Sequence, residues 1–333
     1  MTKLINSQTE LWPRSHKVLC VAALLFVILG IFTTPKLLIS LGPMRRSLTA
    51  HIQSVRDTAY LEVLLFRLLC FVFAASLAVI AIMWRRILDS PFIQSINAHA
   101  PKESARHKAI MRPFNKSLLV ITGCIGAGLL YVALAPRLFS PELLRMIAGE
   151  DGVIEYSTAL LFMICSLMSV ILSFRFSDQR ARVVIHCLFA FGFFLMVGEE
   201  ISWGQRFFNI DTLGVFKNAN VQSENNLHNL FGYFADHIFI VAVLVYGFVL
   251  PVLARISIFY RRLFDLVGLP IASPGLAIGF LMISILQSWV VYRFLMPLPH
   301  FRLEELRELL SAIAFSLLMF ESWLLSRSKE KSR

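Results

Sequence analysis

Long apolar stretches alternate with short polar segments along the chain of 333 residues. An α-helix needs about 20 mostly apolar residues to cross the hydrocarbon core of a bilayer. The pattern therefore predicts an all-α integral membrane protein, a bundle of about eight transmembrane helices. The predicted spans cover residues 18–38, 60–83, 117–136, 153–174, 183–202, 235–254, 275–294 and 304–325.

The polar segments are too short to fold with cores of their own, so a single polytopic membrane domain over residues 1–333 is expected. Residues 85–116 form a basic connection, for which we expect a place on the membrane surface. In residues 137–152, Ser140, Pro141 and Glu142 are typical of a helix start and predict a short interfacial helix. Residues 203–234 form the longest polar connection on the opposite side.

Composition agrees with this reading, because 57% of the residues are hydrophobic and only 16% are charged, outside the soluble range. The five cysteines lie in or beside apolar stretches without a C-x-x-C pair, which indicates small buried side chains rather than disulfides. Residues 18–38 lack a small-residue cleavage pattern, so a retained span is expected rather than a cleaved signal.

The distribution of lysine and arginine predicts the orientation. With the N-terminus inside, the inner segments carry 20 of them and the outer segments 11, the bias expected of cytoplasmic loops. We therefore expect a multi-pass protein of the inner membrane with both termini cytoplasmic. The net charge of +11 then indicates attraction to anionic lipids at the cytoplasmic face, and no nucleic-acid partner, since the basic residues are scattered.

Two adjacent carboxylates, Glu199 and Glu200, close the stretch over residues 183–202. A charge at the bilayer centre costs roughly 2.5 to 3.5 kcal/mol, and charges near the interface are seldom kept without a partner or a task. Neighbours on a helix point about 100° apart, so the two should differ in role. One is expected to pair with a cation such as Arg67, and the other to act as base, acid or ligand. Glu155 is a further acidic residue with which Arg67 could pair. The alternative is that both are interfacial charges at a helix end.

Glu224 and His228 stand four residues apart in the polar connection that follows, so on a helix they share one face. They could act as an acid-base pair, or bind a divalent metal such as zinc together with His237. The alternative is an ordinary hydrogen-bonded loop. The asparagines around them also suit recognition of hydroxyl groups.

The candidate site residues fall into three groups. The candidate catalytic residues are Glu199, Glu200, Glu224 and His228, and the candidate metal ligands are Glu224, His228 and His237. The candidate substrate-binding residues are Arg67, Glu155, Trp203, Gln205, Arg206, Gln222, Asn225 and Asn229. Trp203 on its own is also typical of an interfacial anchor. Glu321 is expected near the inner interface beside Arg327.

The strings GEEISWGQR (198–206) and NVQSENNLHN (220–229), with EDGVIEY (150–156), resemble a family of uncharacterised bacterial multi-pass membrane proteins. That resemblance implies no activity. A fainter one links the Glu199-Glu200 pair and His237 to the CAAX-type membrane glutamyl proteases. It implies a carboxylate that activates water, although Arg206 and Tyr233 depart from that pattern.

The leading hypothesis is an enzyme that acts on a lipid or lipid-linked headgroup at the periplasmic face, by hydrolysis or group transfer. The chain lacks a Walker loop, a dinucleotide fingerprint and a serine nucleophile motif. The alternatives are a non-enzymatic membrane protein, either a transporter or an envelope-assembly partner, and an intramembrane glutamyl-type protease. The largely apolar inner halves of the spans argue against transport.

Overall fold

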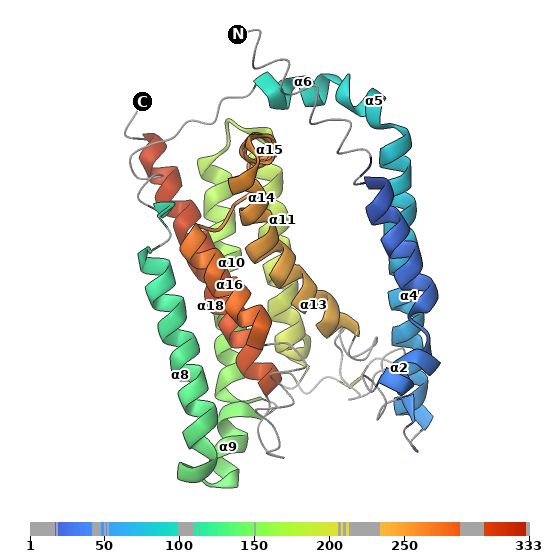
Figure 1. Ribbon diagram of the computed structural model, residues 1–333. Coiled ribbons are helices and arrows are strands. Elements are labelled where there is room, and N and C mark those ends of the chain that lie inside the picture. Colours follow the sequence, from blue (N-terminus) through green and yellow to red (C-terminus); the bar gives the residue numbers. More distant parts are fainter. Residues whose placement is uncertain are drawn as a thin grey trace. The chain divides into compact units, whose positions relative to one another are not determined.

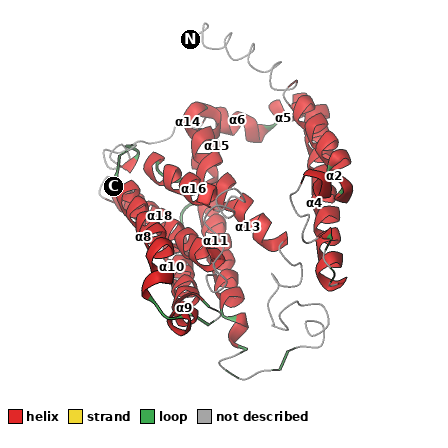
Figure 2. Ribbon diagram, turned by 60° about the horizontal axis from the view of Figure 1, so that its bottom comes forward, coloured by secondary structure: helices red, strands yellow, loops and turns green. Residues whose placement is uncertain are grey.

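A computed structural model shows helices joined by turns, and no strand in the residues that it describes (Figures 1 and 2). These are residues 17, 19–41, 48–49, 51, 53–98, 110–112, 114–149, 151–205, 208, 211–212, 234–286 and 303–330. The predicted all-α membrane fold is confirmed.

Six helices in the described ranges are long and apolar enough to cross a membrane, or seven if one bent pair counts as a single span. They correspond to six of the predicted stretches. The six cover Ala59–Ile82, Lys116–Leu138, Pro141–Arg175, Arg180–Glu200, Ile238–Ile256 and Glu305–Arg327. The stretch expected at 275–294 is represented by the shorter helix α16 (Pro274–Leu286), because residues 287–302 lie outside the described ranges.

The first predicted span is not one straight helix. Leu19–Phe32 and α2 (Pro35–Leu41) meet at an angle of 83°. Pro35 lacks a backbone N–H and its ring clashes with the preceding turn of a continuous helix, so it begins a new helix instead. The expectation of an uninterrupted span over 18–38 therefore missed the effect of this proline.

The chain divides into two compact units, and each is described by itself. The first comprises residues 1–98 and 231–234, with α2, α4 (Gln53–Ile82), α5 (Trp84–Leu88) and α6 (Pro91–Ala98). In it the Leu19–Phe32 helix packs on α4, where Phe26 stacks on Phe73 with 5.6 Å between ring centroids. The expectation of a single domain stays a prediction.

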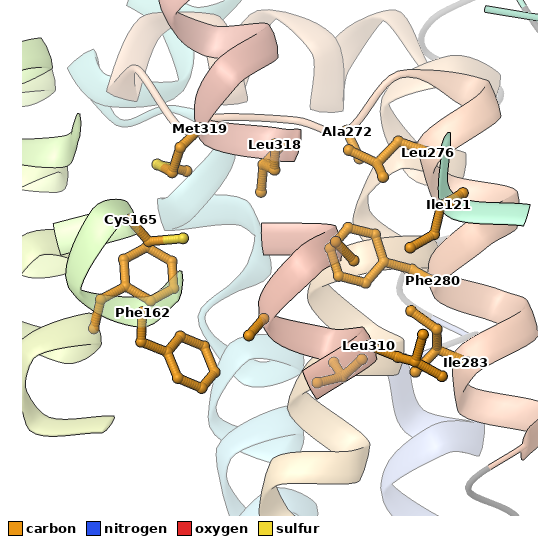
Figure 3. Close-up of a cluster of buried hydrophobic side chains, with 14 of the residues drawn as sticks. Ile121, Phe162, Cys165, Ala272, Leu276, Phe280, Ile283, Leu310, Leu318 and Met319 are labelled. Carbon is orange, nitrogen blue, oxygen red and sulfur yellow. The ribbon is translucent and has the colours of Figure 1, made fainter. Parts of the chain in front are cut away.

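The second unit, residues 99–230 and 235–333, holds the main core. Its helices α8 (Lys116–Leu138), α10 (Val153–Arg175), α11 (Arg180–Glu200), α16 and α18 (Leu303–Glu330) contact one another. Fully buried Phe162, Phe280 and Leu318 lie among them (Figure 3). Large apolar side chains also cover the outward faces, as with Leu160, which is 62% exposed. Apolar residues on all sides of a helix are what a lipid environment requires.

Shorter elements complete the second unit. The short helix predicted after Ser140 is present as α9 (Pro141–Ala148), and the Ser140 hydroxyl caps it by accepting from the Leu143 N–H at 3.3 Å. Its interfacial position stays a prediction. Helix α13 (Phe234–Leu244) continues into a π-helical segment, η3 (Val245–Val249), and α14 (Leu250–Ile256). Pro251 is the second residue after the π-helical segment. A wider turn before a proline relieves the clash of its ring with the preceding carbonyl groups.

Helix α15 (Ile258–Val267) is tied to the start of α11 by an ion pair. The Arg182 guanidinium lies 2.8 Å from the Asp265 carboxylate and also donates to the Asp265 carbonyl at 3.1 Å. Its Cζ lies 5.0 Å from the centroid of the Phe176 ring. Arg182 is thus fully engaged in joining two elements far apart in the sequence.

One buried carboxylate joins three helices of the second unit. Glu321 of α18 is 3% exposed, and its Oε1 accepts from the hydroxyls of Ser117 at 2.5 Å and Ser273 at 2.6 Å. Its Oε2 accepts from the Ser273 N–H at 3.0 Å, and Asn115 donates to the Ser273 hydroxyl at 2.6 Å. Asn115 caps α8 and Ser273 precedes α16, so two positive helix N-termini meet at the carboxylate. We call these four residues the Glu321 network.

Candidate functional site

A left-handed turn ends α11 directly after the paired glutamates. Ser202, Trp203 and Gly204 have φ angles of 45°, 53° and 75°. Only glycine adopts such values at little cost, so the two preceding residues must be held there by their contacts. The string Ser202-Trp203-Gly204 thus encodes an abrupt change of chain direction at the end of a span.

Trp203 folds back over the last turn of α11. Its indole Nε1 donates to Glu199 Oε1 at 2.9 Å, and its ring meets Phe194 edge-on at 6.2 Å between centroids. Gly198 makes this possible, because a Cβ there would lie only 2.7 Å from Cε2 of Trp203. Glu199 therefore helps to hold the tryptophan in place. The catalytic role considered for Glu199 stays a prediction.

We expect Gly198→Ala to displace Trp203 and lower the free energy of unfolding by about 1 to 3 kcal/mol, the usual cost of overpacking. Gly192→Ala is the matched control, since a Cβ at that position of the same helix has nothing within 4 Å. Thermal unfolding of both variants in detergent, with tryptophan fluorescence as a second readout, checks the prediction. Equal stability of the two variants would contradict it.

Glu200 faces a different set of groups from Glu199. Its carboxylate lies with those of Glu305 and Glu308, and one ligand oxygen from each falls within 4.8 Å of the others. Glu200 is the last residue of α11, whereas Glu305 and Glu308 stand three residues apart near the start of α18, so they share one helix face. Glu199 and Glu200 thus have different neighbours, and the separate roles expected for them stay a prediction.

The surroundings of this acidic cluster (Glu200, Glu305 and Glu308) contain a cation and an apolar pocket. Arg307 Nη2 lies 3.1 Å from Glu308 Oε1, with both side chains largely buried. Arg307 and Leu310 also line the pocket, between α18, α8 and α16. Arg307 therefore connects the carboxylates to an apolar recess at the same end of the bundle.

The donor set suits a hard divalent cation. Oxygen ligands lie about 2.0 to 2.6 Å from Mg²⁺ or Ca²⁺, so ligands on opposite sides of the ion are about 4 to 5 Å apart. The three carboxylate oxygens lie within 4.8 Å of one another, close enough to share one such ion. Carboxylates alone favour Mg²⁺, Mn²⁺ or Ca²⁺ over zinc. The zinc hypothesis rested on Glu224, His228 and His237, whose side chains the structure does not describe.

The other candidate residues have varied positions. Glu155 Oε2 accepts from the Asp151 N–H at 2.6 Å at the start of α10, which is a helix-capping contact. Gln205 donates to the Thr212 hydroxyl at 2.9 Å. The candidate residues outside the described ranges are Arg206, Gln222, Glu224, Asn225, His228 and Asn229.

Arg67 was expected to pair with Glu155, Glu199 or Glu200. Its Nε donates to the Gly30 carbonyl at 2.9 Å, across the packing of the first helix on α4. Arg67 belongs to the first unit and the three glutamates to the second, so the pairing stays a prediction.

Sequence reasoning missed Glu305 and Glu308. The sequence could have indicated them, because they stand three residues apart at the start of a predicted span. Charges at the end of a span need an explanation, as Glu199 and Glu200 do. What the sequence does not contain is the pairing of the end of α11 with the start of α18.

Comparisons with protein-family models, curated proteins and solved structures do not identify a relative of this chain. No protein-family model matches the chain, and neither a curated protein nor a solved structure matches it. The resemblances drawn from the motifs therefore stay predictions, and the functional argument depends on the site itself.

Proposed function

We propose that this protein is a membrane-embedded enzyme that binds a divalent cation at Glu200, Glu305 and Glu308. Its substrate would be a lipid or lipid-linked headgroup, transformed by hydrolysis or group transfer. We propose that this end of the bundle faces the periplasm of an inner membrane. The larger number of lysines and arginines in the other set of loops supports this orientation.

The observation that carries the proposal is the meeting of three carboxylates from two distant helices. Glu200 ends one candidate span and Glu305 begins another, so the acidic cluster lies where the spans meet the headgroup region. Gathering three negative groups at a low-dielectric boundary is unfavourable unless cations offset them. Arg307 supplies a positive charge beside Glu308, and a divalent ion would bind all three carboxylates at once.

A substrate headgroup suits this position better than a soluble molecule. The small recess beside Arg307 is lined mainly by aliphatic side chains of α8, α16 and α18, so it offers an apolar contact next to the headgroup region. A divalent cation held by the carboxylates would polarise a phosphoryl or carbonyl oxygen of the headgroup. Arg307 is placed to attract an anionic group.

Cation binding by the full-length protein is the direct test. Glu200→Gln and Glu305→Gln should each weaken Mn²⁺ affinity, measured by titration calorimetry or electron paramagnetic resonance, by at least about tenfold, since each removes a charged ligand. Glu199→Gln is the matched control, because that neighbouring carboxylate engages Trp203 instead. Unchanged Mn²⁺ affinity in Glu200→Gln and Glu305→Gln would refute the site.

Turnover separates an enzyme from a cation-binding membrane protein. The parent and Glu200→Gln should be compared for release or transfer of headgroups from labelled anionic and sugar-linked lipids in nanodiscs. Activity in the parent that Glu200→Gln loses, at normal protein abundance, supports the proposal. Mn²⁺ binding without turnover across the lipid panel would favour the transporter or assembly class instead.

A further inference from the structure

Two arginines from different helices lie against one indole ring at the opposite end of α18. The guanidinium Cζ of Arg175 is 5.6 Å from the centroid of the Trp323 ring, and that of Arg327 is 4.5 Å away. Arg175 is the last residue of α10, and Trp323 and Arg327 are one turn apart on α18. Cation–π attraction fixes each arginine against the ring.

Further contacts hold this arrangement in place. Arg175 Nη1 donates to the Ser326 hydroxyl at 3.1 Å, and that hydroxyl donates to the Trp323 carbonyl at 2.7 Å. The Trp323 ring also stacks on Phe320, with 5.8 Å between centroids. The Arg175 guanidinium and the Trp323 ring are therefore held in place relative to each other.

Among the described residues, Arg175 and Arg327 lack the carboxylate partner that Arg182 has. Arg182, only seven residues after Arg175, lies 2.8 Å from the Asp265 carboxylate. Among the residues that the structure describes, neither Arg175 nor Arg327 has a carboxylate within 4.0 Å. Two cations brought close to one ring repel each other, and a bound anion would lower that repulsion.

The position identifies the kind of anion. Arg175 and Arg327 are the last residues of two candidate spans, so both lie at the boundary where headgroups begin. Tryptophan is enriched at that depth, and basic pockets between transmembrane helices bind anionic headgroups. Guanidinium groups match the oxygen geometry of a phosphate, to which they donate two parallel hydrogen bonds.

We propose that Arg175, Trp323 and Arg327 form a binding site for a phosphate group, provided by an anionic lipid headgroup or by a soluble phosphate ester. The site lies at the other end of α18 from the acidic cluster and does not depend on the proposed function.

Lipid retention by the full-length protein tests the site. Native mass spectrometry should show more phosphatidylglycerol than phosphatidylcholine retained by the parent. Arg175→Gln and Arg327→Gln should each reduce the phosphatidylglycerol affinity about fivefold, because a basic residue contributes on the order of 1 kcal/mol near an anionic surface. Arg180→Gln removes the same charge from an exposed position nearby and should change retention little.

A second arm separates the two sources of phosphate. If the parent shows no preference for phosphatidylglycerol, binding of inorganic phosphate decides. Phosphate that binds the lipid-free parent, and binds Arg175→Gln more weakly, would assign the site to a soluble phosphate ester. Trp323→Phe keeps a ring under both arginines and should retain most of the affinity, whereas Trp323→Leu should not. The proposal is overturned if neither probe distinguishes Arg175→Gln and Arg327→Gln from Arg180→Gln while all three remain folded.

Discussion

Glu321→Ala is expected to lower the free energy of unfolding by about 3 kcal/mol or more, because each buried donor left without its acceptor costs about 1 to 3 kcal/mol. The Ser117 hydroxyl and the Ser273 hydroxyl and N–H would all lose the Glu321 carboxylate. The free energy of unfolding of Glu321→Gln should lie between those of the parent and Glu321→Ala. Its amide keeps one accepting oxygen but places an N–H donor opposite the Ser273 N–H. Unfolding titrations in mixed micelles measure the differences.

Serine substitutions supply the control for this prediction. Ser117→Ala removes one hydrogen bond to a charged acceptor and should cost about 1.5 to 3 kcal/mol. Ser322→Ala should cost little, because its hydroxyl bonds only the Leu318 carbonyl of its own helix, at 2.9 Å. Equal stability of these two variants would show that the Glu321 network does not stabilise the fold.

Phe280→Ala is expected to cost about 3 to 5 kcal/mol through the cavity that it leaves. The Phe280 ring is fully buried, meets Phe315 edge-on at 5.2 Å between centroids, and lies against the backbone of the π-helical segment. A Cβ at Gly247 would be 2.2 Å from Cγ of Phe280. Gly247→Ala alone should therefore also be destabilising, by about 1 to 3 kcal/mol.

The losses of unfolding free energy caused by Phe280→Ala and Gly247→Ala should not be additive. With Phe280→Ala in place the added methyl has room, so we expect a favourable coupling of about 0.5 to 3 kcal/mol between the substitutions. Gly126→Ala is the control, because a Cβ there has nothing within 4 Å. Unfolding free energies of the four combinations give the coupling, and strict additivity would mean that Gly247 and Phe280 are not in direct contact.

The spans could be predicted because length and apolarity alone decide whether a helix crosses a bilayer. That argument located the helices that begin at Lys116, Arg180 and Glu305 to within a few residues. It did not locate the break before Pro35, because the predicted span was extended past the proline to the apolar residues Leu37 and Leu38. The limit there was local backbone geometry, which a hydropathy pattern does not record.

The site could be predicted only in part. Glu200 stood out because a carboxylate at the end of a span needs an explanation, and the adjacent Glu199 suggested a division of roles. Its partners Glu305 and Glu308 depend on which helix ends meet, and spacing along one segment cannot give that. Glu321 shows the same limit, since it was expected beside Arg327 and instead contacts Ser117 and Ser273, more than 40 residues away.

The Glu321 network also sets an order of events during biosynthesis. The chain is made from its N-terminus, so Ser117 and Ser273 leave the ribosome before the carboxylate that they donate to exists. Until α18 inserts, the donors that Glu321 accepts from have only water, headgroups or each other as partners. The arrival of one late residue therefore completes three helices at once.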